Sequence, residues 1–269
     1  MNWSNVFVAA KACLDAAEIS EKIRLSRVAE RLWQDGALAT NSVSPALPIG
    51  EPGRPARPVL VTPAQVPKRG LGSQEGRTAL LHALAHIEFN AINLAWDAVY
   101  RFRDMPPQYY SDWIRVAIEE AYHFELLQKR LRSLGCEYGD LPAHDGLWDM
   151  AKRTAFDPMV RMALVPRVLE ARGLDVTPGI ITKLQHAGDD ESVAALRIIL
   201  RDEIGHVAIG SRWFHHECER RDLVAEQVFA ELVEDYFHGQ LRGPFHYEAR
   251  LQAGFSEAEL HTLQRTGTP

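Results

Sequence analysis

The chain has little cysteine, no long apolar run and no excess of positive charge. Its three cysteines form no Cys-x-x-Cys pair, so we expect reduced thiols in a reducing compartment. No stretch is apolar over the length that a transmembrane helix needs. The net charge of −6 gives no overall attraction to nucleic-acid phosphates. We therefore expect a cytoplasmic protein with no membrane partner, and nucleic acid is not favoured as a partner by charge.

The sequence also lacks the signatures of several common enzyme classes. It contains no glycine-rich phosphate loop, no Cys-x-x-Cys electron-transfer site and no serine-hydrolase elbow. With 269 residues, of which 46% are hydrophobic and 25% charged, it can nevertheless bury a sizeable core. Its chemistry must therefore be sought in other side-chain patterns.

A Glu-x-x-His motif occurs twice, and each copy directly follows another acidic residue. The first runs from Glu120 to His123 and the second from Glu203 to His206. A glutamate and a histidine three positions apart stand on one face of a helix, so both can bind the same metal ion. Each motif is therefore a candidate pair of metal ligands.

A lone glutamate inside an apolar helical pattern precedes each motif at nearly the same distance. Glu88 lies 120 − 88 = 32 residues before the first motif, and Glu170 lies 203 − 170 = 33 residues before the second. Two single-glutamate helices and two Glu-x-x-His helices are the ligand set of a dinuclear carboxylate site in a four-helix bundle. The predicted metal ligands are Glu88, Glu120, His123, Glu170, Glu203 and His206.

The alternative is a chance arrangement of exposed glutamates and histidines with ordinary hydrogen-bond partners. With 11 histidines in the chain, a given glutamate has roughly a 4% chance of a histidine three positions on. One such motif would therefore mean little. The repetition of the whole arrangement, including the preceding acid and the lone glutamate, favours a metal site.

The chain divides into three predicted parts. Residues 1–76 are expected to form helices followed by a proline-rich arm that lies on the main body. Residues 77–219 should form an all-α four-helix bundle, and residues 220–269 a helical extension. The second lone glutamate follows the first histidine by 170 − 123 = 47 positions, and so long a crossover is expected of ferritin-like bundles.

The bundle helices are predicted over residues 78–102, 111–134, 157–172 and 190–218. Ser111 is the expected N-cap of the second helix, and Gly135 is expected to end it. Gly173 is expected to end the third helix, before a turn at residues 177–179 and a short helix. A further helix is expected from about residue 223 to 237, before a tail whose Ser256-x-x-Glu259 has the pattern of a capping box.

Carboxylates with one imidazole per metal suit iron or manganese better than zinc, which prefers four-coordinate sites with more nitrogen or sulfur. Glu120 and Glu203 can bridge two ions and are the predicted catalytic ligands. Glu88 and Glu170 would bind as terminal ligands, and each histidine would complete the protein ligands of one ion. The positions left open could take dioxygen or solvent.

The order Glu, Glu-x-x-His, Glu, Glu-x-x-His resembles the ferritin-like superfamily, which includes ribonucleotide reductase small subunits, bacterial multicomponent monooxygenases, rubrerythrin and ferritins. The resemblance implies that the acid before each motif hydrogen-bonds the ligand histidine of the opposite half. Asp202 would then orient His123, and Glu119 would orient His206. The alternative is that Glu119 and Asp202 are solvated helix charges.

A closer resemblance covers nearly the whole chain. The strings HALAHIE at 82–88, YGDLPAH at 138–144, RVLEARGLD at 167–175 and RDEIGH at 201–206 look like an uncharacterised bacterial ferritin-like family. That family is related at fold level to MiaE-type tRNA hydroxylases. The resemblance implies the fold and the ligands, but fold does not determine the reaction.

The predicted function is a di-iron or Mn/Fe oxygen-activating oxidoreductase, an oxygenase or oxidase that uses dioxygen as co-substrate. Hydroxylation of a small molecule or a modified nucleoside is the first expectation. An external electron donor is needed, because no flavin or iron–sulfur motif is visible, and a homodimer is compatible with the sequence. The alternatives are ferritin-like iron oxidation and storage or peroxide detoxification, and a metal-stabilised interaction module without turnover.

Other polar residues near the motifs receive structural interpretations. His82 and His86 are four apart, but His86 is two positions from Glu88 and should point elsewhere. His144 is interpreted as a loop residue of the crossover, with the lining of a substrate entrance as the alternative. We expect a pocket that opens between the bundle helices and is partly roofed by the arm or the crossover, with Gly205 leaving room beside the metals.

Overall fold

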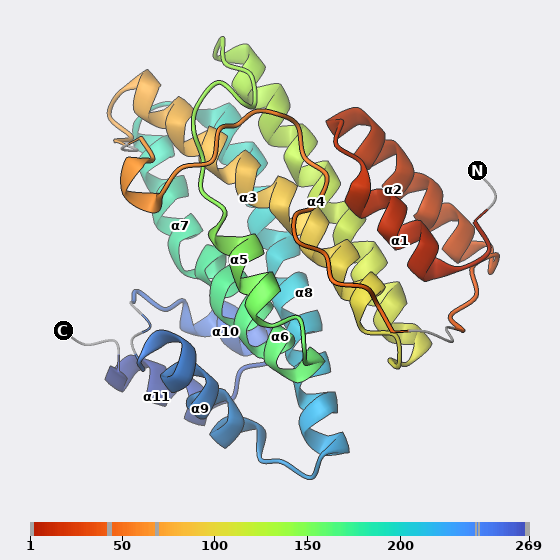
Figure 1. Ribbon diagram of the computed structural model, residues 1–269. Helices are drawn as coiled ribbons and strands as arrows, with labels where there is room; N and C mark the ends of the chain where they lie inside the picture. The colour runs from red at the N-terminus through yellow and green to blue at the C-terminus, as the bar shows by residue number, and fades with distance from the viewer. Residues whose placement is uncertain (1–2, 42–44, 68–69, 240, 242, 267–269) are drawn as a thin grey trace. The chain divides into compact units, whose positions relative to one another are not determined.

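A computed structural model describes residues 3–41, 45–67, 70–239, 241 and 243–266 of the chain. Across these residues the secondary structure is helical apart from two isolated β-bridges, so the all-α prediction is confirmed (Figure 1). The chain forms two compact units, Met1–Lys152 and Arg153–Pro269. The three-part division at residues 76 and 219 stays a prediction. Among the described residues, no helix combines the length and apolar character needed to cross a membrane.

The first unit is built around a pair of long helices. These are α3 and α4, which follow one another along the chain and pack together along their lengths (Figure 1). The two short amino-terminal helices cover them, α1 against α3 and α2 against α4. The bounds are Val6–Asp15 for α1, Ile19–Gln34 for α2, Gln74–Arg101 for α3, Pro107–Ser133 for α4 and Gly146–Arg153 for α5, which follows the crossover.

Local sequence explains where the two long helices begin and end. Ser73 caps α3, because its hydroxyl accepts a hydrogen bond from the backbone N–H of Gly76. The prediction that Ser111 caps α4 is wrong: the helix begins one turn earlier at Pro107, whose fixed φ suits the first helical position. Gly135 adopts a φ of +77° directly after α4, which confirms its predicted role at the helix end.

Hydrogen bonds join the proline-rich arm to other parts of the first unit. The backbone N–H of Gly53 donates to the Leu14 carbonyl at 2.7 Å, and the Trp148 indole donates to the Gly50 carbonyl at 2.8 Å. Leu60 and Ala143 form a parallel β-bridge between the arm and the crossover. These contacts satisfy backbone groups that an arm without regular structure would otherwise leave to water.

Two buried histidines of α3 hold the crossover in place. The His82 Nε2 atom accepts a hydrogen bond from the backbone N–H of Gly139 at 2.9 Å. The Nδ1 atom of His86 lies 2.9 Å from the Tyr138 hydroxyl oxygen, and its Nε2 atom lies 3.2 Å from the His144 carbonyl oxygen. Burial lowers the pKa of both imidazoles to about 4, so both are neutral at pH 7. These contacts fit the interpretation of His82 and His86 as structural residues.

The neutral state of His82 predicts a loss of stability in mild acid. Its pKa is about 4 in the folded protein and about 6.5 in an unfolded chain, so the unfolded state binds more protons between these values. The stabilisation is complete above pH 6.5 and is lost as the pH falls toward 4. In His82→Gln, an amide oxygen can still accept from Gly139 but does not titrate. Between pH 7 and pH 5 this variant should lose about 1–2 kcal/mol less unfolding free energy in urea titrations than the wild type; equal losses would contradict the prediction.

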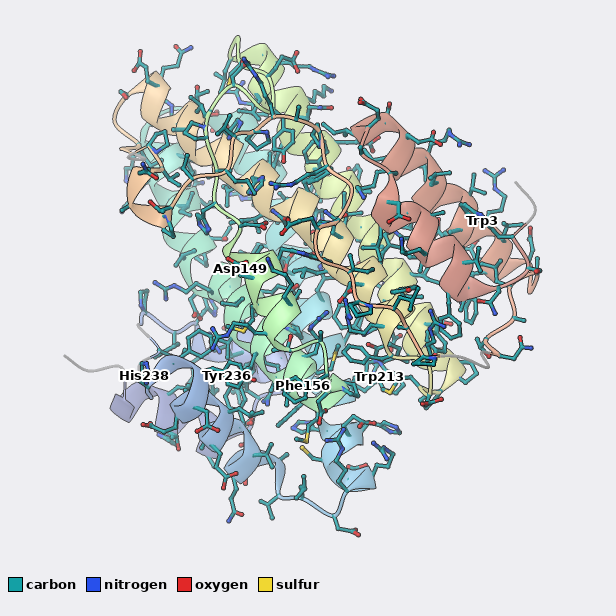
Figure 2. The ribbon with its side chains drawn as sticks, in the orientation of Figure 1. Trp3, Asp149, Phe156, Trp213, Tyr236 and His238 are labelled. Atoms are coloured by element: carbon teal, nitrogen blue, oxygen red, sulfur yellow. The ribbon has the colours of Figure 1, made fainter. Side chains whose placement is uncertain are left out.

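The second unit has α8 as its longest helix. It packs against α6, the π-helical segment η2, α7 and α9, and α10 contacts both α7 and α8. The Tyr236 ring on α9, labelled in Figure 2, lies 4.8 Å from the guanidinium carbon of Arg153 at the start of this unit. The bounds are Pro158–Leu164 for α6, Val165–Glu170 for η2, Ala171–His186 for α7, Asp190–Arg220 for α8, Ala225–Phe237 for α9, Tyr247–Gln252 for α10 and Glu257–Thr266 for α11.

The predicted end of the third bundle helix and the turn after it are wrong. No break occurs at Gly173, because α7 continues through it and through Pro178 as far as His186. A proline inside a helix costs about 3 kcal/mol. Here the buried face continues on both sides of the proline, from Leu174 to Leu184. Burial of that face offsets the lost hydrogen bond.

Side-chain caps begin α6, α8 and α11 in this unit. Asp157 caps α6 and Asp189 caps α8, each through a side-chain oxygen that accepts from the first turn. Ser256 and Glu259 form the predicted capping box: the Ser256 N–H donates to Glu259 at 2.8 Å, and the Glu259 N–H donates to the Ser256 hydroxyl at 3.1 Å.

Candidate metal centre

The first unit brings together its three predicted ligands. Glu120 and His123 lie one turn apart on α4, and Glu88 reaches them from α3. The Nδ1 atom of His123 is 3.4 Å from a carboxylate oxygen of Glu120 and 3.4 Å from one of Glu88. All three side chains are buried. The lone glutamate and the first Glu-x-x-His therefore form one cluster, as the spacing predicted.

Burial and neighbouring charges shift the pKa of two groups in the first cluster, Glu88 and His123. Desolvation, followed by the charge of Glu120, raises the pKa of Glu88 well above its usual range. Burial alone would lower the pKa of His123, but hydrogen bonds and charges from Glu120 and Glu88 outweigh it and raise the pKa to about 11. In the absence of metal, protons thus compensate the clustered carboxylates. A cation could take over that compensation.

The second unit holds the other Glu-x-x-His pair on α8. The Nδ1 atom of His206 lies 3.3 Å from a carboxylate oxygen of Glu203, and both residues are buried. Glu170 is also buried and is the last residue of η2, at the junction with α7. The sequence predicted a regular helix here. The π-helical geometry is instead marked by the Ala171 N–H, which donates to the Pro166 carbonyl five residues back.

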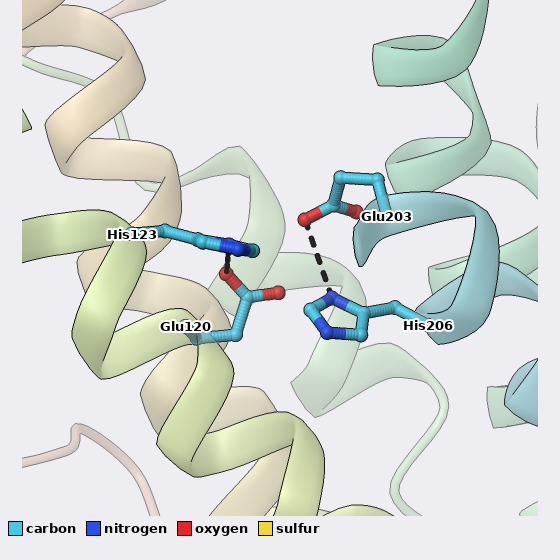
Figure 3. A group of neighbouring side chains, drawn as sticks. All are labelled: Glu120, His123, Glu203 and His206. Atoms are coloured by element: carbon cyan, nitrogen blue, oxygen red, sulfur yellow. Dashed lines mark hydrogen bonds and ion pairs between the residues drawn. The ribbon is translucent and has the colours of Figure 1, made fainter. Parts of the chain in front are cut away.

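Each unit thus holds one buried Glu-x-x-His pair, Glu120 with His123 and Glu203 with His206, whose ligand atoms could hold a metal ion. Figure 3 shows the contact within each Glu-x-x-His pair as a dashed line. Each pair offers one imidazole nitrogen and at least one carboxylate oxygen, which are donors for iron, manganese or zinc.

The acids before the motifs each lie beside an arginine of the same helix. Arg115 donates to Glu119 at 2.8 Å, and Arg201 donates to Asp202 at 2.8 Å. The four-residue spacing of Arg115 and Glu119 in the sequence is typical of an ion pair on one helix face. The roles that the resemblance implies, Asp202 toward His123 and Glu119 toward His206, stay predictions.

Two glycines near the predicted ligands of the second unit have open space beside them. A Cβ atom added to Gly205 or to Gly173 would meet no atom within 4 Å. A groove of about 690 Å³ lies between α2 and α4, lined by residues such as Arg27 and Gln128 and by none of the predicted ligands. The predicted pocket that leads to the metals therefore stays a prediction.

Comparison with known proteins assigns the chain to a family. Residues 15–261 match the model of the DUF455 family, described as a protein of unknown function. A relative from Haemophilus influenzae (strain ATCC 51907 / DSM 11121 / KW20 / Rd), named "Uncharacterized protein", is 50% identical over 213 residues, which cover 77% of this chain and 74% of the relative. No solved structure matches the chain. The chain therefore belongs to the DUF455 family.

Proposed function

We propose that the protein is a ferritin-like di-metal oxidoreductase that uses two irons, or manganese and iron, to activate dioxygen. The observation that carries the proposal is the repeated arrangement of a buried glutamate and a buried Glu-x-x-His pair. In the first unit, both glutamates contact the histidine of the motif. In the second unit, the same residue types recur with nearly the same spacing. Under this proposal α3, α4, α7 with η2, and α8 are the four helices of one bundle.

The donor set fits two hard cations. Carboxylate oxygens outnumber imidazole nitrogens, which favours iron or manganese over zinc. When bound, the metals would bind and reduce dioxygen. Glu120 and Glu203 would bridge the ions. Glu88 and Glu170 would bind as terminal ligands. The apolar residues around the ligands would exclude water and hold an organic substrate beside the metals.

The substrate proposed is a small organic molecule or a modified nucleoside, with hydroxylation as the first reaction to test. The nucleoside option follows from the fold-level resemblance to MiaE-type hydroxylases. Electrons would come from an external donor. Glu119 and Asp202 are proposed to orient the ligand histidines, through hydrogen bonds that form alongside their pairing with arginine.

Anaerobic loading with Fe(II) tests the proposal. We expect two irons per chain after removal of excess metal. On exposure to air, the loaded protein should consume oxygen, and further added Fe(II) should not be oxidised and stored by it. Gel filtration of the loaded protein distinguishes this function from ferritin-like iron storage. A large assembly holding many irons per chain would instead show ferritin-like storage, and a protein that retains less than one metal per chain would contradict the dinuclear site.

The variant Gly205→Leu separates metal binding from substrate access. Open space around this position should accommodate the larger side chain, so the iron content should stay close to that of the wild type. The leucine would occupy room one residue before His206, so oxygen consumption stimulated by substrate should fall at least tenfold. Ala194→Leu, at an exposed position near the start of the same helix, controls for added bulk. Unchanged oxygen consumption in Gly205→Leu would argue against a substrate pocket on this side of α8.

A further inference from the structure

The π-helical segment that carries Glu170 has a structural cause. Pro166 has no N–H to donate, and in a regular helix its ring would clash with the carbonyl of Met162. The wider π turn over Val165–Glu170 avoids that clash while the chain stays helical. The turn ends on Glu170, so the geometry of the turn sets the position of the Glu170 backbone and the direction of its side chain.

Two contacts hold the π turn against α8. A Cβ atom on Gly210 would overlap the ring of Pro166, so only glycine allows this approach. The adjacent residue Arg167 donates from Nε to the Ser211 hydroxyl at 3.1 Å. Gly210 and Ser211 follow His206 by about one helical turn. The segment that carries Glu170 is therefore fixed to the same stretch of α8 that carries the second Glu-x-x-His pair.

The side chain of Arg167 continues to the carboxyl-terminal helix. Its Nη2 atom donates to both carboxylate oxygens of Glu259 on α11 at 2.8 Å, and both residues are almost fully buried. Its guanidinium carbon lies 4.4–4.7 Å from the ring centroids of Phe214, Phe229 and Phe255. The hydrogen bonds from Nη2 and the aromatic faces offset the cost of burying the charges.

We propose that Arg167 is a positioning residue for the metal centre: it clamps the π turn between α8 and the carboxyl-terminal helix α11 and so fixes Glu170. This inference rests on the proposed function, since it takes Glu170 as a ligand. It gives the carboxyl-terminal extension a role in the site, although none of its residues is a predicted ligand. Removing the clamp should leave the turn free to shift and should weaken metal binding.

The test replaces the charged pair with apolar side chains of similar size, Arg167→Met with Glu259→Leu. Such a replacement of a buried ion pair is often neutral for folding, so the variant should remain folded. Mn(II) is titrated into metal-free protein, and free Mn(II) is followed by electron paramagnetic resonance. We expect the dissociation constant to rise at least tenfold, as for other residues that orient metal ligands. Hydrogen exchange of the backbone amides of residues 167–171 should accelerate as well.

The matched control is Arg250→Met with Asp175→Leu. This buried pair, 2.8 Å apart, also anchors the carboxyl-terminal extension, and Arg250 shares the Phe255 ring with Arg167. Its two hydrogen bonds join α10 to α7. We expect this variant to bind Mn(II) within threefold of the wild type.

Each other result has a distinct meaning. Wild-type affinity in the Arg167/Glu259 variant would overturn the positioning role while leaving the proposed metal site intact. Equal weakening in both double variants would also overturn it, because the effect would then come from loosening the extension in general. If the wild type itself binds no Mn(II) and no Fe(II), the proposed function fails, and the positioning role fails with it.

Discussion

Chelation should lower the melting temperature of the metal-loaded wild type by roughly 8–16 °C, and Glu120→Ala should abolish this difference. A ligand at a thousand times its dissociation constant stabilises the native state by about 4 kcal/mol. For a chain of this size, 1 kcal/mol corresponds to about 2–4 °C. Glu120 is buried, its carboxylate lies 3.4 Å from the Nδ1 atom of His123, and it is the predicted bridging ligand. Its loss should therefore affect both ions. The measurement is a thermal melt of each protein with and without chelator.

The same experiment contains a second comparison. Without metal, burial and then repulsion from Glu120 raise the pKa of Glu88, and the alanine variant no longer bears the cost of that repulsion. Metal-free Glu120→Ala should consequently lose less stability than a buried deletion of this size normally causes. Glu125→Ala is the matched control, because Glu125 lies on the same helix in an ion pair with Arg27 that is partly exposed. A chelator effect that persists in Glu120→Ala but disappears in Glu125→Ala would refute the assignment of ligands.

Trp96→Ala should destabilise the protein by about 3–5 kcal/mol, the usual cost of truncating a large buried aromatic residue. Trp96 is fully buried on α3, and its indole N–H donates to the Ser26 hydroxyl of α2 at 2.8 Å. The substitution removes packing and a hydrogen bond that joins two helices. Urea unfolding followed by circular dichroism measures the change.

Two further variants separate packing from hydrogen bonding at this position. Trp96→Phe keeps most of the ring volume but loses the indole donor, so a loss of about 1–2 kcal/mol is expected. Phe156 is 71% exposed, and Phe156→Ala should change the unfolding free energy by less than about 0.5 kcal/mol. If Trp96→Ala cost no more than Phe156→Ala, α3 would not be at the core of the first unit.

The sequence alone determined the helical class and the candidate ligands. Apolar residues that recur every three to four positions indicate helices, because that spacing places them on one face. The same geometry pairs Glu120 with His123 and Glu203 with His206, so a local pattern was enough to propose both pairs. Helix ends with a local chemical cause, such as Gly135, Asp157 and the Ser256–Glu259 capping box, were also within reach.

The tertiary structure alone decided the features that depend on distant partners. Helix α7 continues past Pro178 because burial of its apolar face outweighs the local cost of the proline, and local propensity does not include that burial. The π turn depends on the fit of Pro166 against Gly210, and Arg167 finds Glu259 across 92 residues. Such contacts form between side chains that no periodic pattern relates. The sequence therefore identified the candidate ligands, whereas the contacts that hold the π turn became visible only in the folded chain.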